Sequence, residues 1–180
     1  MRPDTRDTLV RLLLPWLGVV AILLAARIRH FSPADLGVRP PNLTSALIWT
    51  ACFAGLVILE EILSPMVGVP APERWGTVYG LPTKLLRVVA MVVSAPVAEE
   101  LLFRGLIYHV VANTWLRDTG AIVVSAAAFA ALHVQYGAAA LLFVVIDGLF
   151  YGTVRYSTDS ILLTIALHAA GNAYAAYQRF

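Results

Sequence analysis

Acidic, basic and imidazole side chains interrupt stretches of this sequence that are otherwise apolar. Residues 96–105 read PVAEELLFRG, with KLLRVVAMVVSA before them and LIYHVVANTW after them. An ionisable group in hydrocarbon costs roughly 2.5 to 3.5 kcal/mol on insertion scales, so each one requires a partner or a purpose. The polar and ionisable groups that need such an explanation are Glu99, Glu100, Arg104, His133, Asp147, His168 and Asn172.

Helix geometry assigns different tasks to the two adjacent acids. At about 100° per residue, Glu100 and Arg104 project about 40° apart, which predicts an ion pair that neutralises itself and braces the helix. A direct chemical role for this pair is the alternative. Glu99 projects about 140° from Arg104 and has no local partner. Such a carboxylate can take a proton from water, so Glu99 is a candidate general base. The alternative is a structural Glu99 that accepts hydrogen bonds from a hydroxyl or a backbone group.

The later spans contribute imidazoles, a carboxamide and one more acid. His168 and Asn172 lie four residues apart in HAAGN, so their donors share one helix face and can stabilise a developing oxyanion. A pair that only bridges helices would have the same spacing, and a lone membrane histidine such as His133 often serves only packing. Asp147 lines a cavity, makes a bundle-facing hydrogen bond, or pairs with Arg155 or another group.

The composition places these groups in an integral membrane protein. The chain has 180 residues, of which 59% are hydrophobic and 13% charged, and its mean hydropathy is +0.77. A bilayer core about 30 Å thick takes roughly 20 residues per helix, so residues 1–180 form one membrane domain of about five to seven spans. The net charge of +2, without a basic stripe, argues against nucleic acid as a partner.

The cysteine content limits the covalent and metal chemistry of the chain. Cys52 is the single cysteine, which excludes an internal disulfide and a multi-cysteine metal site.

The apolar pattern predicts an all-α, polytopic transmembrane bundle of about six spans, with the active site buried between helices. The first span is interpreted as retained rather than as a cleaved signal peptide. Pro96 is expected to kink the long third span, and Gly148 and Gly152 are expected to let another helix approach closely. The predicted spans are 9–26, 43–63, 84–115, 120–134, 138–154 and 160–177, and the segment 64–83 is predicted to lie at the membrane interface.

The alternating direction of successive spans indicates which polar groups lie at the same depth in the membrane. Short loops predict antiparallel neighbours, which places His133 and Asn172 at the same side of the midplane as Glu99. We therefore expect Glu99 to contact His133 across a hydrated pocket, with His168 and Asn172 facing them.

The order and spacing of these residues resemble those of a known family. Glu99, Glu100 and Arg104 form E-E-x-x-x-R, Phe129 and His133 form F-x-x-x-H, and His168 and Asn172 form H-x-x-x-N. This set resembles the CAAX protease and bacteriocin-processing (CPBP) family of intramembrane proteases, which includes the type II CAAX prenyl endopeptidases. The resemblance covers residues 84–177, as a catalytic core, and leaves 1–83 as two N-terminal spans plus the interfacial segment.

The resemblance implies roles for these positions. Glu99 and His133 would activate water against a peptide bond, and His168 and Asn172 would stabilise the tetrahedral oxyanion. Supporting roles would fall to Glu100 and Arg104, and the cavity would include Phe103, Phe129 and Asp147. The chain departs from the larger eukaryotic relatives in having about six spans where eight are typical, and Asp147 has no place in the motif set.

Metal use is open at the level of sequence. Glu99, His133 and His168 have the donor types of an open zinc site with a water in the fourth position. The sequence contains no H-E-x-x-H, and a glutamate mechanism without metal accounts for the same residues, so we favour a site with no cofactor.

Three functions fit the residues. The first is an intramembrane endopeptidase that acts on a membrane-associated or lipidated protein or peptide, in a multi-pass protein of the bacterial inner membrane. The second is a non-catalytic immunity or partner-binding protein of the same fold. The third is a proton-coupled transporter with a relay through Glu99, His133 and Asp147, which the lack of an evident paired repeat disfavours. Both termini are expected in the cytoplasm, with the cavity opening toward that face.

Overall fold

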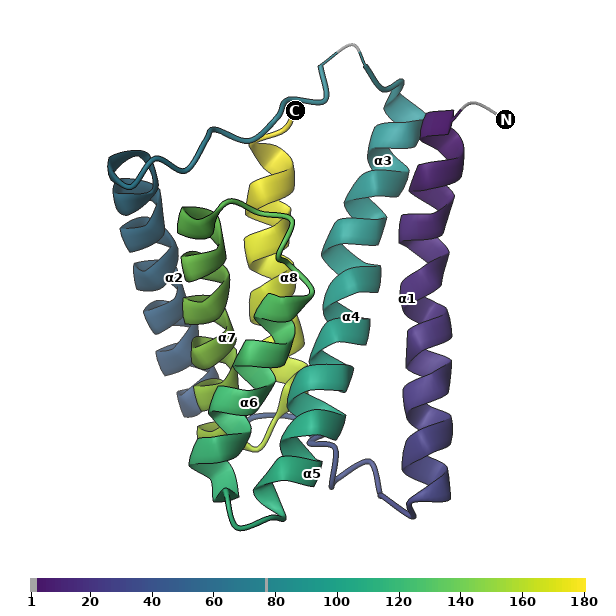
Figure 1. Ribbon diagram of the computed structural model, residues 1–180. Helices are drawn as coiled ribbons and strands as arrows, with labels where there is room; N and C mark the ends of the chain where they lie inside the picture. Colours follow the sequence, from purple (N-terminus) through teal and green to yellow (C-terminus); the bar gives the residue numbers. More distant parts are fainter. Residues whose placement is uncertain (1–2, 77) are drawn as a thin grey trace.

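The computed structural model describes residues 3–76 and 78–180, and within these ranges the chain forms helices and connecting segments but no strand. The third helical passage, from 81 to 112, is continuous, although its segments η1 and η2 are π-helical. Six passages therefore alternate in direction (Figure 1). The elements are α1 (Pro3–Ile28), α2 (Leu43–Met66), α3 (Leu81–Val89), η1 (Ala90–Ser94), α4 (Ala95–Glu100), η2 (Leu101–Ile107), α5 (Tyr108–Ala112), α6 (Arg117–Ala131), α7 (Ala138–Thr158) and α8 (Ile161–Tyr177).

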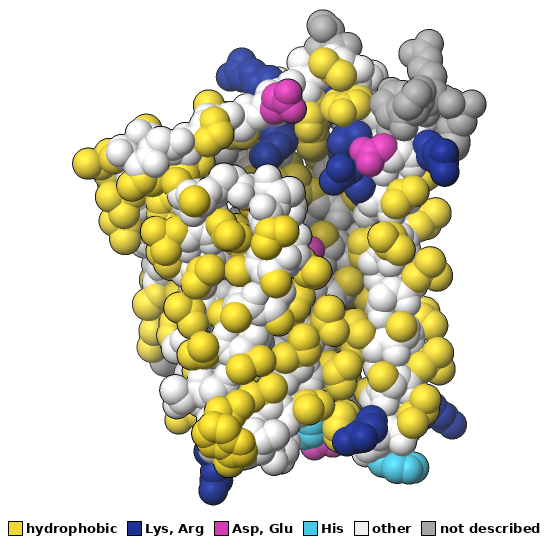
Figure 2. Space-filling view, in the orientation of Figure 1, with side chains coloured by type: hydrophobic (Ala, Val, Ile, Leu, Met, Phe, Trp, Pro, Cys, Tyr) yellow, Lys and Arg dark blue, Asp and Glu magenta, His cyan; other side chains and the backbone are white. Residues whose placement is uncertain are grey.

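Both termini lie at one end of the bundle, which we call the terminal end, and the connector between α1 and α2 lies at the other, the far end (Figure 1). Helices α1, α2 and α7 are long and apolar enough to cross a membrane, and α8 is a shorter apolar helix. Only 11% of the apolar window of α1 and 6% of that of α2 are buried inside the protein. Apolar side chains cover the middle of the visible face, while charged ones gather toward its two ends (Figure 2). The fold is thus a helical membrane bundle, as predicted.

Glycines bring α6 and α7 into close contact. A Cβ added to Gly148 would lie 3.0 Å from both Cα and Cβ of Ala126, and one added to Gly152 would lie 3.1 Å from Ile122 Cγ2. The predicted close approach at Gly148 and Gly152 is therefore confirmed, and α6 is the partner helix. The close contact also places the carbonyl of Gly148 in α7 within hydrogen-bond distance of Arg104 in the third passage.

We expect Gly148→Ala to lower the free energy of unfolding by about 1–3 kcal/mol, because its methyl group overpacks against the backbone of Ala126. Gly55→Ala in α2 is the matched control, since nothing lies within 4 Å of its added Cβ. That substitution should be neutral or should stabilise by about 0.5–1 kcal/mol through helix propensity. Denaturant unfolding in detergent measures both, and equal effects of the two substitutions would contradict the predicted contact.

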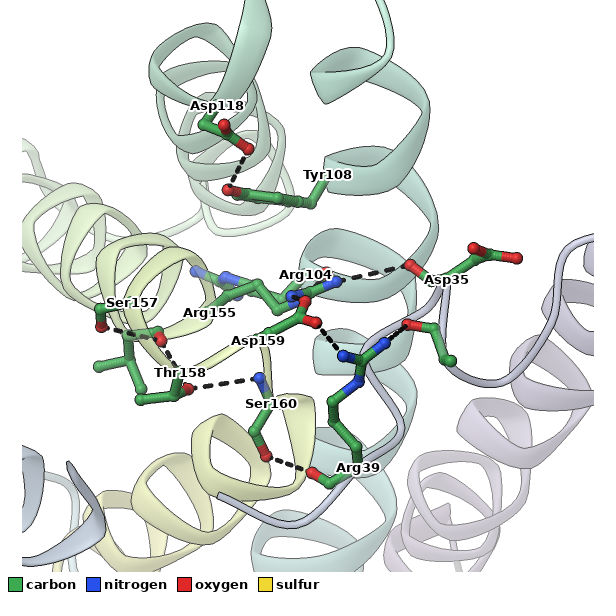
Figure 3. A network of polar contacts seen from close by, with 12 residues as sticks. Asp35, Arg39, Arg104, Tyr108, Asp118, Arg155, Ser157, Thr158, Asp159 and Ser160 are labelled. Atoms are coloured by element: carbon green, nitrogen blue, oxygen red, sulfur yellow. Dashed lines mark hydrogen bonds and ion pairs between the residues drawn. The ribbon is translucent and has the colours of Figure 1, made fainter. Parts of the chain in front are cut away.

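A polar network at the far end holds α7 against the third passage (Figure 3). Arg155 is buried, its Nε donates to the carbonyl of Arg104 at 3.1 Å, and its guanidinium pairs with Asp159. Arg39 from the connector pairs with the same Asp159 carboxylate. Arg155 therefore does not pair with Asp147, which was one of the alternatives that the sequence left open.

The connector between α1 and α2 packs into this network. The backbone N–H and the hydroxyl of Ser32 both donate to Asp35 Oδ2 at 2.7 Å, and these bonds hold the pKa of Asp35 below its usual value. Gly37 has φ +72°, and a Cβ there would lie 2.5 Å from Nε of Arg155. The carbonyl of Gly37 accepts the N–H of Ile161 at 2.8 Å, so the connector links α1 to the start of α8.

Candidate active site

An ion pair between Glu100 and Arg104 lies fully inside the bundle. Arg104 Nη1 donates to Glu100 Oε1 at 2.9 Å, and both side chains are 0% exposed. The ion pair predicted from helical spacing is thus confirmed. Arg104 Nη2 also donates to the carbonyl of Gly148 at 3.0 Å, and its guanidinium lies 4.6 Å from the ring centroid of Phe129. These contacts neutralise the two charges, while Glu100 Oε2 and Arg104 Nε are buried without a hydrogen-bond partner among the described residues.

His168 lies between the two adjacent acids. Its Nδ1 is 2.9 Å from Glu100 Oε1, and its Nε2 is 3.8 Å from Glu99 Oε2. The ring of Tyr151 is nearly parallel to the imidazole, at 15° and 5.2 Å between centroids, and that of Phe129 meets it edge-on. Glu100 therefore does more than neutralise an arginine, because it also holds this imidazole.

Glu99 and His133 do not make the contact that the sequence predicted. The side chain of Glu99 is 24% exposed and has His168 as its closest basic partner, while it interacts with His133 only through longer-range electrostatics. The expected contact between Glu99 and His133 is absent from the described part of the chain. The reason is that α6 ends at Ala131, so His133 lies in the following turn rather than on the helix.

A backbone carbonyl sets which ring nitrogen of His133 carries a proton. Its Nδ1 lies 2.9 Å from the carbonyl oxygen of Phe129. A carbonyl only accepts hydrogen bonds, so Nδ1 carries a proton, and in the neutral ring Nε2 keeps a lone pair. His133 is therefore prepared to accept a hydrogen bond at Nε2.

Asn172 connects α8 to the π-helical segment η1. Its Nδ2 donates to the carbonyl oxygen of Met91 at 2.8 Å. Asn172 shares a helix face with His168, as its spacing predicts, but its amide also binds a backbone carbonyl of the third passage. One N–H of the amide is occupied by the protein, and an amide nitrogen has two.

A cavity of about 310 Å³ opens among α2, α7, α8 and the turn after α6, toward the terminal end. Glu99 is not one of the residues that line it, and it approaches the cavity through its neighbour His168. Phe103, expected in the cavity, lies outside it, because its buried ring packs edge-on against Phe129. The lining includes five of the site residues predicted from the sequence: Phe129, His133, Asp147, His168 and Asn172.

Comparison with known proteins identifies the family. The family described as type II CAAX prenyl endopeptidase Rce1-like matches residues 81–174, which is just over half of the chain. This chain belongs to the type II CAAX prenyl endopeptidase Rce1-like family. No curated protein and no solved structure matches it. The predicted resemblance is therefore confirmed, and the family is one of proteases that act on membrane-embedded protein substrates.

The part that matches the Rce1-like family contains Glu99, Glu100, Arg104, both cavity histidines and Asn172.

Two further acids line the cavity, Glu60 and Glu61 of α2, and they lie outside the part of the chain that matches the family. Glu61 Oε1 accepts a hydrogen bond from Gln178 at 3.0 Å, while Glu60 Oε1 is buried and has no hydrogen-bond donor among the described residues. Our sequence reasoning missed this pair, although two adjacent acids in the apolar stretch LVILEEIL were a signal of the same kind as Glu99 and Glu100.

The donor side chains of this Rce1-like site are not gathered into a ready group of metal ligands. Within residues 3–76 and 78–180, no three His, Cys, Asp or Glu side chains are grouped closely enough to hold one. Zinc on Glu99, His133 and His168, the alternative from the sequence, stays a prediction, because hydrogen bonds occupy only Nδ1 of each histidine and leave Nε2 of each as a possible ligand. We therefore derive no step that passes through a metal.

Proposed function

We propose that this protein is an intramembrane endopeptidase that hydrolyses a peptide bond of a membrane-associated or lipidated protein, with Glu99 as general base and without metal. The observation that carries the proposal is the position of His168, which lies on the wall of a membrane-embedded cavity and between two carboxylates. Proteolysis in a bilayer needs water, a base and an oxyanion donor in one enclosed place. Membership of a protease family supports the same reaction.

In the proposed reaction a water molecule attacks the carbonyl carbon of the scissile amide. Glu99 removes a proton from the water as the new C–O bond forms, and the π electrons of the carbonyl move to its oxygen. Nε2 of His133 accepts a hydrogen bond that orients the water. The tetrahedral intermediate then collapses, the C–N bond breaks, and protonated Glu99 returns its proton to the leaving amine. The products are a carboxylic acid and an amine.

His168 would stabilise the oxyanion in its imidazolium form. Its Nδ1–H points at Glu100, so a donor toward the substrate must come from Nε2–H. The Glu100 carboxylate accepts from Nδ1–H and so holds the ring in this orientation. Asn172 offers the second donor, through the N–H that Met91 does not occupy.

The acidic side chains of the cavity lining suggest which peptides to test. Glu60, Glu61 and Asp147 line it, and no Lys or Arg side chain is among its described lining residues. A lysine or arginine on the substrate would find carboxyl oxygens there as hydrogen-bond acceptors while its alkyl chain packs on the apolar walls. Substrates with a basic residue near the cleaved bond therefore belong in the assay.

The distribution of basic side chains favours a cytoplasmic terminal end, and hence a cavity that opens to the cytoplasm of a bacterial inner membrane. Lys and Arg are enriched on the cytoplasmic side of membrane proteins. The helix bounds place six basic residues near the terminal end, Arg6, Arg11, Arg74, Lys84, Arg87 and Arg179, and five near the far end, Arg27, Arg29, Arg39, Arg117 and Arg155.

The experiment uses the full chain purified in detergent and a panel of membrane-anchored peptides, prenylated and unprenylated, with basic or neutral residues near the C-terminus. We expect mass spectrometry to detect a cleaved peptide and a chelator to leave the rate unchanged. Loss of activity that zinc restores would overturn the metal-free mechanism. Binding of peptides without cleavage of any would instead favour the non-catalytic partner-binding function.

A further inference from the structure

The carbonyl of Met91 has neither of its usual helical donors. In an α-helix the donor would be the N–H of Ala95, but this N–H donates to the carbonyl of Ala90, five residues earlier, in the π register. In that register the donor to Met91 would be residue 96, which is a proline and has no N–H. A carbonyl inside a membrane bundle that lacks a donor costs free energy, so another group must supply one.

Asn172 supplies this donor from a different helix. Its Nδ2 lies 2.8 Å from the Met91 oxygen, and the carbonyl can only accept, which sets the orientation of the amide. Asn172 also belongs to the wall of the cavity, one helical turn after His168. The same side chain thus meets the third passage on one side and the cavity on the other.

We propose that Pro96 is a positioning residue for Asn172. By leaving the Met91 carbonyl open, Pro96 creates the acceptor that holds the carboxamide of Asn172 at the cavity wall. An alanine at position 96 would bring an N–H that competes for this carbonyl, and the carboxamide would then lose its anchor. The catalytic consequence rests on the proposed function, whereas the contact itself does not.

Isotope-edited infrared spectroscopy tests the contact without any substrate. The chain has three methionines, and Met66 is 75% exposed, so a Met66→Leu background labelled with [1-¹³C]methionine reports on Met91 and the first residue. We expect Asn172→Ala to move the Met91 carbonyl band to higher wavenumber, because the carbonyl loses its donor. In a Pro96→Ala background the same substitution should leave the band in place. If Asn172→Ala does not shift the Met91 carbonyl band while Pro96 is present, the proposal is overturned.

Kinetics test the consequence. We expect Pro96→Ala to lower kcat by about 10- to 100-fold with little change in KM, as for a displaced oxyanion donor. It should have no further effect in an Asn172→Ala background. Pro82→Ala is the matched control, since Pro82 also lies in the first turn of its helix but is exposed and away from the cavity.

The outcomes separate this inference from the proposed function. An unchanged kcat in Pro96→Ala, or additive losses in the double variant, would overturn the positioning role even where the protein cleaves peptides. If the protein cleaves no peptide, the proposed function fails, and the infrared response of Met91 alone decides whether Pro96 positions Asn172.

Discussion

Glu99→Gln is expected to lower kcat for peptide cleavage by about 10²- to 10⁴-fold, the usual contribution of a general base. Glutamine keeps the size of the side chain and its hydrogen-bonding ability but cannot take a proton from water at neutral pH. The fold should persist, because Glu99 is partly exposed and its closest charged partner is 3.8 Å away. Rates of peptide cleavage in detergent, with circular dichroism as the check on folding, measure this effect.

The matched control is Glu73→Gln, an exposed acid in the segment between α2 and α3 that does not line the cavity. It should retain the rate of the unmodified protein. Activity of Glu99→Gln within a few-fold of that rate would remove Glu99 as the base and leave the proposed mechanism without its first step.

Glu100→Gln is expected to destabilise the protein by about 3–5 kcal/mol, the cost of leaving one partner of a buried ion pair uncompensated. The Arg104 guanidinium is 0% exposed, so water cannot replace the lost carboxylate. His168 loses its Nδ1 acceptor charge in the same variant, which adds to the effect on activity. Denaturant unfolding in detergent gives the change in the free energy of unfolding.

A double variant separates loss of the pair from loss of one charge. Glu100→Gln combined with Arg104→Met should be less destabilised than Glu100→Gln alone, because no unpaired charge remains. If the double variant shows the sum of the two single losses, the two side chains act independently and the ion pair is not what stabilises this region.

Much of the fold follows from local patterns along the chain. Apolar stretches of membrane length predict the helical passages, and prolines and glycines mark the connectors, since backbone groups in lipid must bond within their own helix. The pair of Glu100 with Arg104 was predictable for a related reason. It depends only on helical periodicity, which acts between residues four apart.

The sequence also led to His133, His168 and Asn172 as groups of one site, and the cavity contains all three. It could not predict that His168, rather than His133, is the imidazole nearest to Glu99. The end of α6 before His133 and the π-helical segments of the third passage change which way side chains project, and neither shows in the residue pattern.

The sequence by itself thus determined the membrane location, the passages and the types of group that line the site. Only the tertiary structure decided which of them meet. Asn172 contacts Met91 from 81 positions away, and Glu60 of α2 shares a cavity with Asp147 of α7. Helical periodicity specifies projection within one helix, whereas the rotation and depth of one helix against another depend on packing contacts summed over the whole bundle, such as Gly148 against Ala126.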